Sequence, residues 1–189
     1  MRLPAEAHGR RLTIDEYRRL PDDGWRTELV RGRVIREPQP GFRHGEIQTR
    51  LAFLLLEHIR KHRLDLACVG PVGVIVDCAN STVRGPDLAV ISRSRLPSPE
   101  HEGFLEDPPE LVVEIVSPTN RGSGVTKKVR EYLGAGVPVI WVVDPDARAV
   151  TVHRDGSQRV VEGSDALDAA DLLPGLMIRT EELFGPPPR

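Results

Sequence analysis

The feature that most constrains the fold is a strand-helix-strand pattern in the second half of the chain. Leu111 to Val116 and Val139 to Val143 are apolar runs rich in β-branched residues, which is typical of buried strands. Between them, Val125 to Ala135 carries apolar side chains at helical spacing, and Gly136 and Pro138 end that segment. We therefore expect an α/β chain with this unit in its core.

Other segments predict the elements around this unit, from turn residues and from the spacing of apolar side chains. In chain order we expect a short helix after the capping box Thr13 to Glu16, a hairpin of Glu28 to Val30 with Val34 to Arg36, a long helix from about His44 to Lys61, paired strands at Val69 to Asp77 and Asp87 to Ser92 around turn residues at Asn80 to Gly85, a hairpin of Ala149 to His153 with Gln158 to Val161 around Asp155-Gly156, and a last short helix at Thr180 to Phe184.

Length and composition favour one domain. The 189 residues suit a single core, which we place at residues 12–184, between a flexible N-terminus (1–11) and a flexible tail (185–189). No apolar run reaches the roughly eighteen residues of a membrane span, and the first residues are polar, so we expect a cytoplasmic protein. Cys68 and Cys78 are expected to be reduced, half-buried thiols. A net charge of −2 neither requires nor excludes a nucleic-acid partner.

Glu114 interrupts the apolar strand Leu111 to Val116. An unpaired buried charge costs several kcal/mol, so we expect this carboxylate to face a cation, a lysine or a water-filled cleft. An ordinary buried ion pair, or an edge strand with Glu114 facing water, would explain the sequence equally well. Glu114 alone therefore leaves function and structure as equal alternatives.

Asp87 is a candidate site residue because it can pair with Glu114. It follows Pro86 at the start of an apolar strand, a position where most aspartates serve only a turn. Two carboxylates at neighbouring strand ends repel each other, and a divalent ion with oxygen ligands is a common way to relieve that repulsion. The pair would fit Mg²⁺.

The helical spacing distinguishes two adjacent lysines. Only three of the 26 basic residues are lysines, so this chain uses arginine where any positive charge suffices. Val125, Val129, Tyr132 and Leu133 define the expected buried stripe; Lys128 lies roughly 100° from its centre and Lys127 roughly 160°. We predict that Lys128 leans toward the sheet and that Lys127 faces solvent. A lysine that merely extends along the helix flank is the alternative for Lys128.

Further candidates carry weaker signals. His44 at its helix start could bind a metal or shuttle a proton, although a hydrogen-bonded structural histidine is the more common case. Glu28 could face the cleft or form a surface salt bridge. Residues 122–124, Gly-Ser-Gly, could form a phosphate-binding loop but lack the Walker pattern. The signatures of zinc proteases, serine hydrolases and dinucleotide enzymes are absent from the sequence.

In order, these features resemble the Uma-type restriction endonuclease family of the PD-(D/E)XK nuclease superfamily. The resemblance runs from about Leu12 to Phe184 and rests on these blocks: Thr-Ile-Asp-Glu-Tyr, Leu-Pro-Asp-Asp-Gly, Glu28-Leu-Val-Arg-Gly-Arg-Val, His44, Pro86-Asp87, Val113-Glu114-Ile-Val-Ser-Pro-Thr, Lys128 and Gly136-Val-Pro-Val-Ile-Trp-Val-Val-Asp144-Pro. It implies a restriction-endonuclease-like α+β core, a mixed central β-sheet flanked by helices, to which the N- and C-terminal hairpins would add.

The resemblance also implies an activity. Asp87 and Glu114 match the acidic residues of the PD-(D/E)XK motif, while the expected lysine two positions later is Val116, and Lys128 on the next helix matches the migrated lysine of the Uma-type pattern. Glu28 and His44 match family positions at the cleft, and Gly124 stands near a missing acidic residue.

We therefore expect an endonuclease in which Asp87 and Glu114, with Glu28 as a further ligand or base, hold Mg²⁺ or Mn²⁺. Lys128 and His44 would act on the phosphate of a nucleic acid, with DNA as first choice. A homodimer would suit double-strand cutting. The alternative is a degenerate nuclease fold that binds nucleic acid or a protein partner without catalysis.

Overall fold

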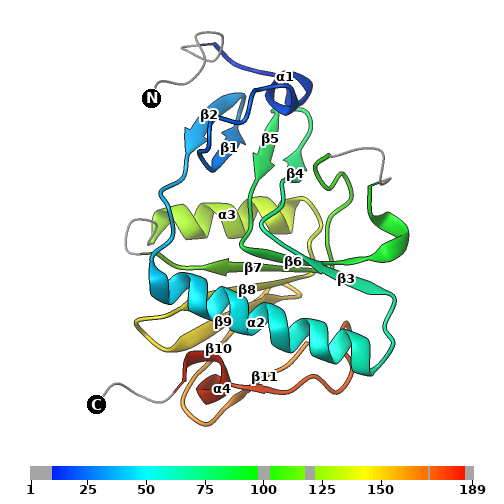
Figure 1. Ribbon diagram of the computed structural model, residues 1–189, viewed down its shortest axis with the longest axis vertical. Coiled ribbons are helices and arrows are strands. Elements are labelled where there is room, and N and C mark those ends of the chain that lie inside the picture. Colours follow the sequence, from blue (N-terminus) through cyan, green and yellow to red (C-terminus); the bar gives the residue numbers. More distant parts are fainter. Residues whose placement is uncertain (1–9, 98–102, 118–121, 170, 186–189) are drawn as a thin grey trace.

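A six-stranded mixed sheet forms the centre of the molecule (Figure 1). The computed structural model describes residues 10–97, 103–117, 122–169 and 171–185. The strand order is β10-β9-β8-β7-β6-β3; β7 and β8 are parallel and the other neighbours antiparallel. In chain order these strands are β3 (Leu66–Val69), β6 (Leu88–Ser92), β7 (Leu111–Ile115), β8 (Val139–Asp144), β9 (Ala149–Arg154) and β10 (Ser157–Val161).

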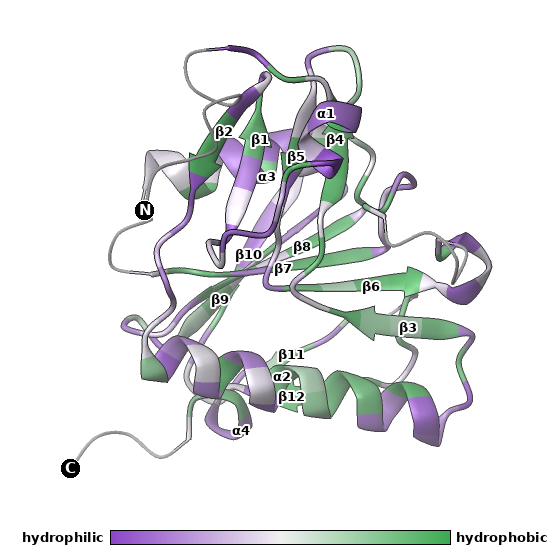
Figure 2. Ribbon diagram, turned by 45° about the horizontal axis from the view of Figure 1, so that its top comes forward, coloured by the Kyte–Doolittle hydropathy of each residue, from purple (hydrophilic) through white to green (hydrophobic). Residues whose placement is uncertain are grey.

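Helices cover both faces of this sheet, so β7 and β8 are predominantly hydrophobic (Figure 2). Helices α2 (Phe42–Lys61) and α4 (Thr180–Phe184) lie on one face, and α3 (Ser123–Gly134) lies on the other (Figure 1). Because side chains alternate along a strand, Leu111 and its i+2 neighbours pack into the core shared with α2, whereas Val112 packs against α3. Glu114 has the same parity as Val112 and therefore faces the α3 side.

A second sheet stands on the α3 side of the first (Figures 1 and 2). Its strand order is β2-β1-β5-β4, and short helix α1 (Ile14–Arg18) packs on its own small core of Leu12, Leu29, Ile75 and Val83. The strands are β1 (Thr27–Val30), β2 (Arg33–Arg36), β4 (Val74–Asp77) and β5 (Thr82–Arg84). Since β5 continues through Gly85 and Pro86 into β6, the two sheets meet where Asp87 lies.

Most expected elements are present. The Thr13 capping box, the N-terminal hairpin, α2, α3, the hairpin around Asp155-Gly156 and α4 are confirmed. The short pair β11 (Ala166–Leu167) with β12 (Ile178–Arg179) and the 3₁₀ turn η2 (Arg93–Arg95) have no clear signal in the sequence. The expected flexible ends fall mostly on residues 1–9 and 186–189, outside the described part.

The expected strand from Val69 to Asp77 is wrong. The chain leaves β3 at Gly70-Pro71 and re-enters a different sheet as β4, so β3 pairs with β6 while β4 pairs with β5. Pro71 offers no backbone N–H to a continuing ladder, which explains the break. The segment Asn80 to Gly85, expected to be a turn, contains strand β5. The β-branched residues Thr82 and Val83 pair there with Asp77 and Ile75 of β4.

Cys68 is half-buried as expected, whereas Cys78 is exposed, and both are free thiols. Within the described ranges, none of the helices combines the length and the apolar character needed to cross a bilayer.

Candidate active site

Asp87 and Glu114 lie opposite each other on the two central strands. Leu88 pairs with Val113 in the antiparallel ladder, so Asp87 and Glu114 are the next pair of residues, and directly opposed side chains share one face of a sheet. The Asp87 N–H extends the ladder by donating to the Val113 carbonyl at 3.1 Å. Both side chains are buried, at 4% and 5% relative exposure. The expected acidic pair is therefore brought together.

Hydrogen bonds from two elements, β7 and α2, fix Asp87. The Ile115 N–H donates to Asp87 Oδ2 at 2.8 Å, and His44 Nε2 lies 3.1 Å from the same oxygen. Gln48, one turn further along α2, donates to the Asp87 carbonyl at 2.9 Å. Asp87 Oδ1 faces the Arg26 guanidinium at 3.5 Å. His44 thus orients the aspartate from the head of α2, and Oδ1 keeps lone pairs for a further ligand.

Among the described residues, two side chains of α3 hold the Glu114 carboxylate. Tyr132 donates its hydroxyl to Glu114 Oε1 at 2.6 Å, and Lys128 Nζ lies 3.5 Å from Oε2. Burial raises the pKa of Glu114 to about 7, against the opposing effect of Lys128 and with added repulsion from Asp87 and Glu28. Burial therefore favours the neutral form of this carboxyl more strongly than water does.

The two lysines separate as the helical spacing predicts. The Lys128 side chain is 7% exposed and the Lys127 side chain 49%. The buried stripe itself differs from the expected one, because Leu133 is exposed whereas Val129 and Tyr132 are buried. Without Leu133, the stripe centre moves toward Lys128.

Burial of Lys128 disfavours its charged form, but the neighbouring carboxylates of Glu114 and Glu28 raise the pKa of Lys128, which stays protonated.

Glu28 anchors this lysine. Lys128 Nζ lies 2.8 Å from Glu28 Oε1, which also accepts the Gly85 N–H at 3.0 Å. Arg84 Nη1 contacts Glu28 Oε2 at 2.5 Å, and its Nε contacts Glu131 at 2.6 Å. Burial alone would raise the pKa of Glu28, but Lys128 and Arg84 lower it. Glu28 is therefore an ionised, fully engaged carboxylate beside the acidic pair.

A small cavity of about 40 Å³ connects these groups. Its volume exceeds the space of one water molecule, roughly 10–15 Å³ on a comparable measure. Glu28 lines a neighbouring hollow instead. The cavity is lined by Arg26, Glu37, Pro38, Pro40, His44, Gly85, Asp87, Glu114, Ile115, Ser117 and Lys128.

The donor set at this cavity suits a hard cation. Asp87 and Glu114 supply two carboxylates, and Mg²⁺ commonly binds to one or two carboxylates and completes its shell with water and substrate phosphate. In the part of the chain that the structure describes, no cluster of three or more His, Cys, Asp or Glu side chains forms a ready-made metal site. Asp87 and Glu114 are the two residues that could hold such an ion, and solvent or phosphate oxygens would have to complete its shell.

Five further residues shape the site without having stood out in the sequence. Tyr132 reads as an ordinary core position of α3, and the pairing of Arg84 with Glu28 and Glu131 depends on the fold. Arg26, Glu37 and Gln48 sit in segments of unremarkable pattern. Their only sequence signal is nearness to other candidates: Gln48 lies one helical turn after His44, and Tyr132 one turn after Lys128.

Comparisons with known proteins address the fold and the family of this chain. The crystal structure of a protein from Anabaena variabilis ATCC 29413, described as "a putative nuclease belonging to DUF820", superimposes with a TM-score of 0.79 at 24% identity, over 92% of this chain and 97% of that one. This likeness confirms the fold. No curated protein matches the chain. The model of the Uma2 family, described as "Putative restriction endonuclease", matches residues 14–181, and the chain therefore belongs to that family.

Proposed function

We propose that the protein is a nuclease that hydrolyses phosphodiester bonds of nucleic acid, DNA in the first instance, with a divalent cation at Asp87 and Glu114. One observation carries the proposal: two opposed, buried carboxylates and a buried lysine line the same cavity. The family description and the fold of the Anabaena variabilis protein support it.

A bound Mg²⁺ or Mn²⁺ would polarise the scissile phosphate and lower the pKa of an attacking water. The protein supplies the rest. Lys128 offsets negative charge that develops on the phosphate, because its ammonium lies in a site largely closed to solvent. His44 holds Asp87 through Nε2 and lines the cavity in which the phosphate would lie. Arg26, beside Asp87 and partly exposed, offers a guanidinium for an adjacent phosphate.

Glu28 takes a supporting part in this scheme. Its two oxygens are occupied by Lys128, Gly85 and Arg84, so we assign to it the placement of the lysine. A direct role as metal ligand or base, the other expectation for Glu28, would require Lys128 to release it.

The adjacent lysines provide a matched test. Plasmid and single-stranded DNA are incubated with Mg²⁺ or Mn²⁺ and the wild type, Lys128→Met or Lys127→Met. We expect Lys128→Met to lower the cleavage rate at least about a hundredfold, as for the loss of other charge-stabilising groups, and Lys127→Met to cleave normally. Asp87→Ala and Glu114→Gln should also abolish cleavage. Cleavage that survives these two substitutions, or an inactive wild type, would refute the proposal.

A second candidate is a binding protein with a degenerate site. The observation in its favour is that Lys128 already compensates Glu28 and Glu114 without a metal ion. Calorimetric titration with Mn²⁺ separates the two candidates. A nuclease should bind the ion and lose it on Asp87→Ala, whereas a degenerate site should show no saturable binding.

A further inference from the structure

A second hollow adjoins the catalytic cavity and plays no part in the chemistry described so far. Its volume is about 160 Å³, and Arg26, Glu37 and Gly85 line both it and the cavity. The two spaces therefore share a wall. A substrate whose phosphate lies at Asp87 and Glu114 would reach this hollow across the three shared residues.

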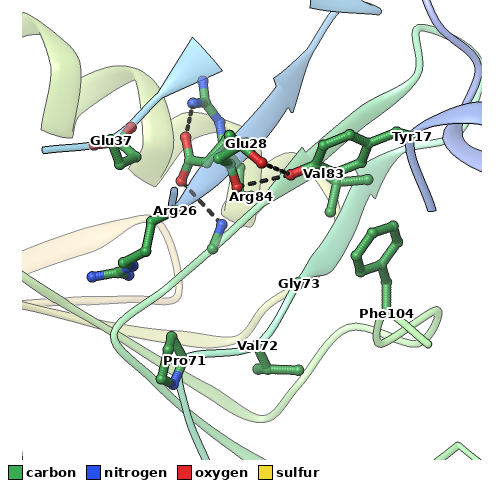
Figure 3. A pocket seen from close by; sticks show the side chains of 12 residues that line it. Tyr17, Arg26, Glu28, Glu37, Pro71, Val72, Gly73, Val83, Arg84 and Phe104 are labelled. Carbon is green, nitrogen blue, oxygen red and sulfur yellow. Dashed lines mark hydrogen bonds and ion pairs between the residues drawn. The ribbon is translucent and has the colours of Figure 1, made fainter. Parts of the chain in front are cut away.

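The walls of the hollow combine flat apolar surface with a charged edge. Pro71, Val72 and Phe104 form one side, and Arg26 and Glu37 lie on the other (Figure 3). Glu28 and Arg84 at the back are committed to each other, and the Tyr17 hydroxyl donates to the Thr27 carbonyl at 2.8 Å. Arg26, 3.5 Å from Asp87 Oδ1, and Glu37, 3.9 Å from Lys128 Nζ, are charged groups at the wall that the hollow shares with the cavity.

The apolar wall is held in place by its own packing. Phe104 stacks on Tyr17 with ring centroids 5.5 Å apart, and the Arg18 guanidinium lies 5.5 Å from the Phe104 ring centre. A side-chain carbon added at Gly73 would lie 2.3 Å from Phe104, so the ring sits directly against this backbone. Preformed hollows with apolar walls and a few convergent polar groups are the usual form of small-ligand sites.

We propose that this hollow binds the nucleobase of the nucleotide next to the scissile phosphate. A base has apolar faces that suit Pro71, Val72 and Phe104, and a hydrogen-bonding edge that suits Arg26 and Glu37. A base within a duplex is stacked and paired, so the hollow selects single-stranded or extruded nucleotides. The inference rests on the proposed function and narrows its substrate class.

Binding without metal tests the inference separately from catalysis. Fluorescence anisotropy in EDTA is measured with a labelled single-stranded oligonucleotide and with a strand of the same length in which every base is replaced by an abasic residue. The intact strand should bind about tenfold more tightly, which is the usual scale of base contacts with apolar and aromatic side chains. Equal affinity for the two strands would overturn the inference.

Two variants locate the effect. Val72→Phe fills the hollow and Phe104→Ala removes part of its wall; each should weaken binding of the intact strand about fivefold or more and leave the abasic strand unchanged. Phe53→Ala, at an exposed site on α2, is the control. If Phe104→Ala does not fold, Val72→Phe carries the test. If the wild type cleaves DNA and Val72→Phe binds the intact strand as tightly as the wild type does, this inference is overturned while the proposed function stands. An inactive wild type overturns the proposed function.

Discussion

At the scale of single residues, the site depends on how Glu114 is held. Both of its oxygens are engaged by one helix, since Tyr132 and Lys128 are four positions apart on α3. A ligand carboxylate that is fixed in this way loses little freedom when it binds an ion. Residues that hydrogen-bond to a metal ligand commonly change the affinity for the metal by a factor of about ten to a hundred.

Removing only the Tyr132 hydroxyl should therefore weaken metal binding. Tyr132→Phe keeps the buried ring but frees Glu114 Oε1, and we expect its Kd for Mn²⁺ to rise about tenfold in calorimetry. Tyr17→Phe is the matched control, because it removes a hydroxyl bonded to Thr27 instead. Equal Mn²⁺ affinity in both variants and the wild type would show that Tyr132 serves packing alone.

Glu114 also predicts a pH dependence of stability. Its pKa rises from 4.5 to about 7 on folding, so its contribution is fully present below about pH 4.5 and is lost as the pH rises through 7. Glu114→Gln, which cannot ionise, should therefore be more stable than the wild type at pH 8, on the order of 1 kcal/mol. Urea unfolding at pH 8 and pH 5 measures this. A difference that does not shrink at pH 5 would contradict the assigned shift.

At the scale of elements, the site lies where the chain passes between the two sheets, from β3 to β4 and from β5 to β6. The link between β3 and β4 passes so close to β6 that a side-chain carbon added at Gly70 would lie 2.3 Å from the Asp87 carbonyl oxygen. Close packing of this link thus supports the carbonyl that accepts the Gln48 hydrogen bond. The link is a structural support for the aspartate.

Gly70→Ala should consequently destabilise the protein and disturb Asp87. We expect a loss of about 1–3 kcal/mol, as for other overpacked sites, measured by urea unfolding. Gly134→Ala, at the end of α3 with open space around it, is the control and should cost nothing. A Gly70→Ala protein as stable as the wild type would mean that the link can move away from β6.

The sequence predicts elements better than contacts between them. The capping box correctly indicated α1, helical spacing correctly indicated α2 and α3, and the apolar run around Glu114 correctly indicated an interior strand. The stripe on α3 even separated Lys128 from Lys127. The break at Gly70 was missed because the apolar pattern continues on both sides of it. The Arg84 and Tyr132 contacts were missed because they depend on packing between distant segments.

At the scale of the whole molecule, the central sheet supplies the carboxylates and the surrounding parts supply their partners. Helix α3 brings Lys128, α2 brings His44, and the second sheet brings Glu28 and Arg84. The hollow beside the cavity lies against this second sheet, between Tyr17 and Gly85. The proposed chemistry and the proposed base-binding site therefore occupy adjoining spaces.

The most direct test of the account is anomalous diffraction from crystals soaked in Mn²⁺. We predict a peak between the carboxylates of Asp87 and Glu114, at the roughly 2.0–2.2 Å ligand distances typical of small divalent ions, and its disappearance in Asp87→Ala crystals. A map with no peak there, or with Mn²⁺ bound only elsewhere, would contradict the assignment of this cavity as the metal-dependent centre of a nuclease.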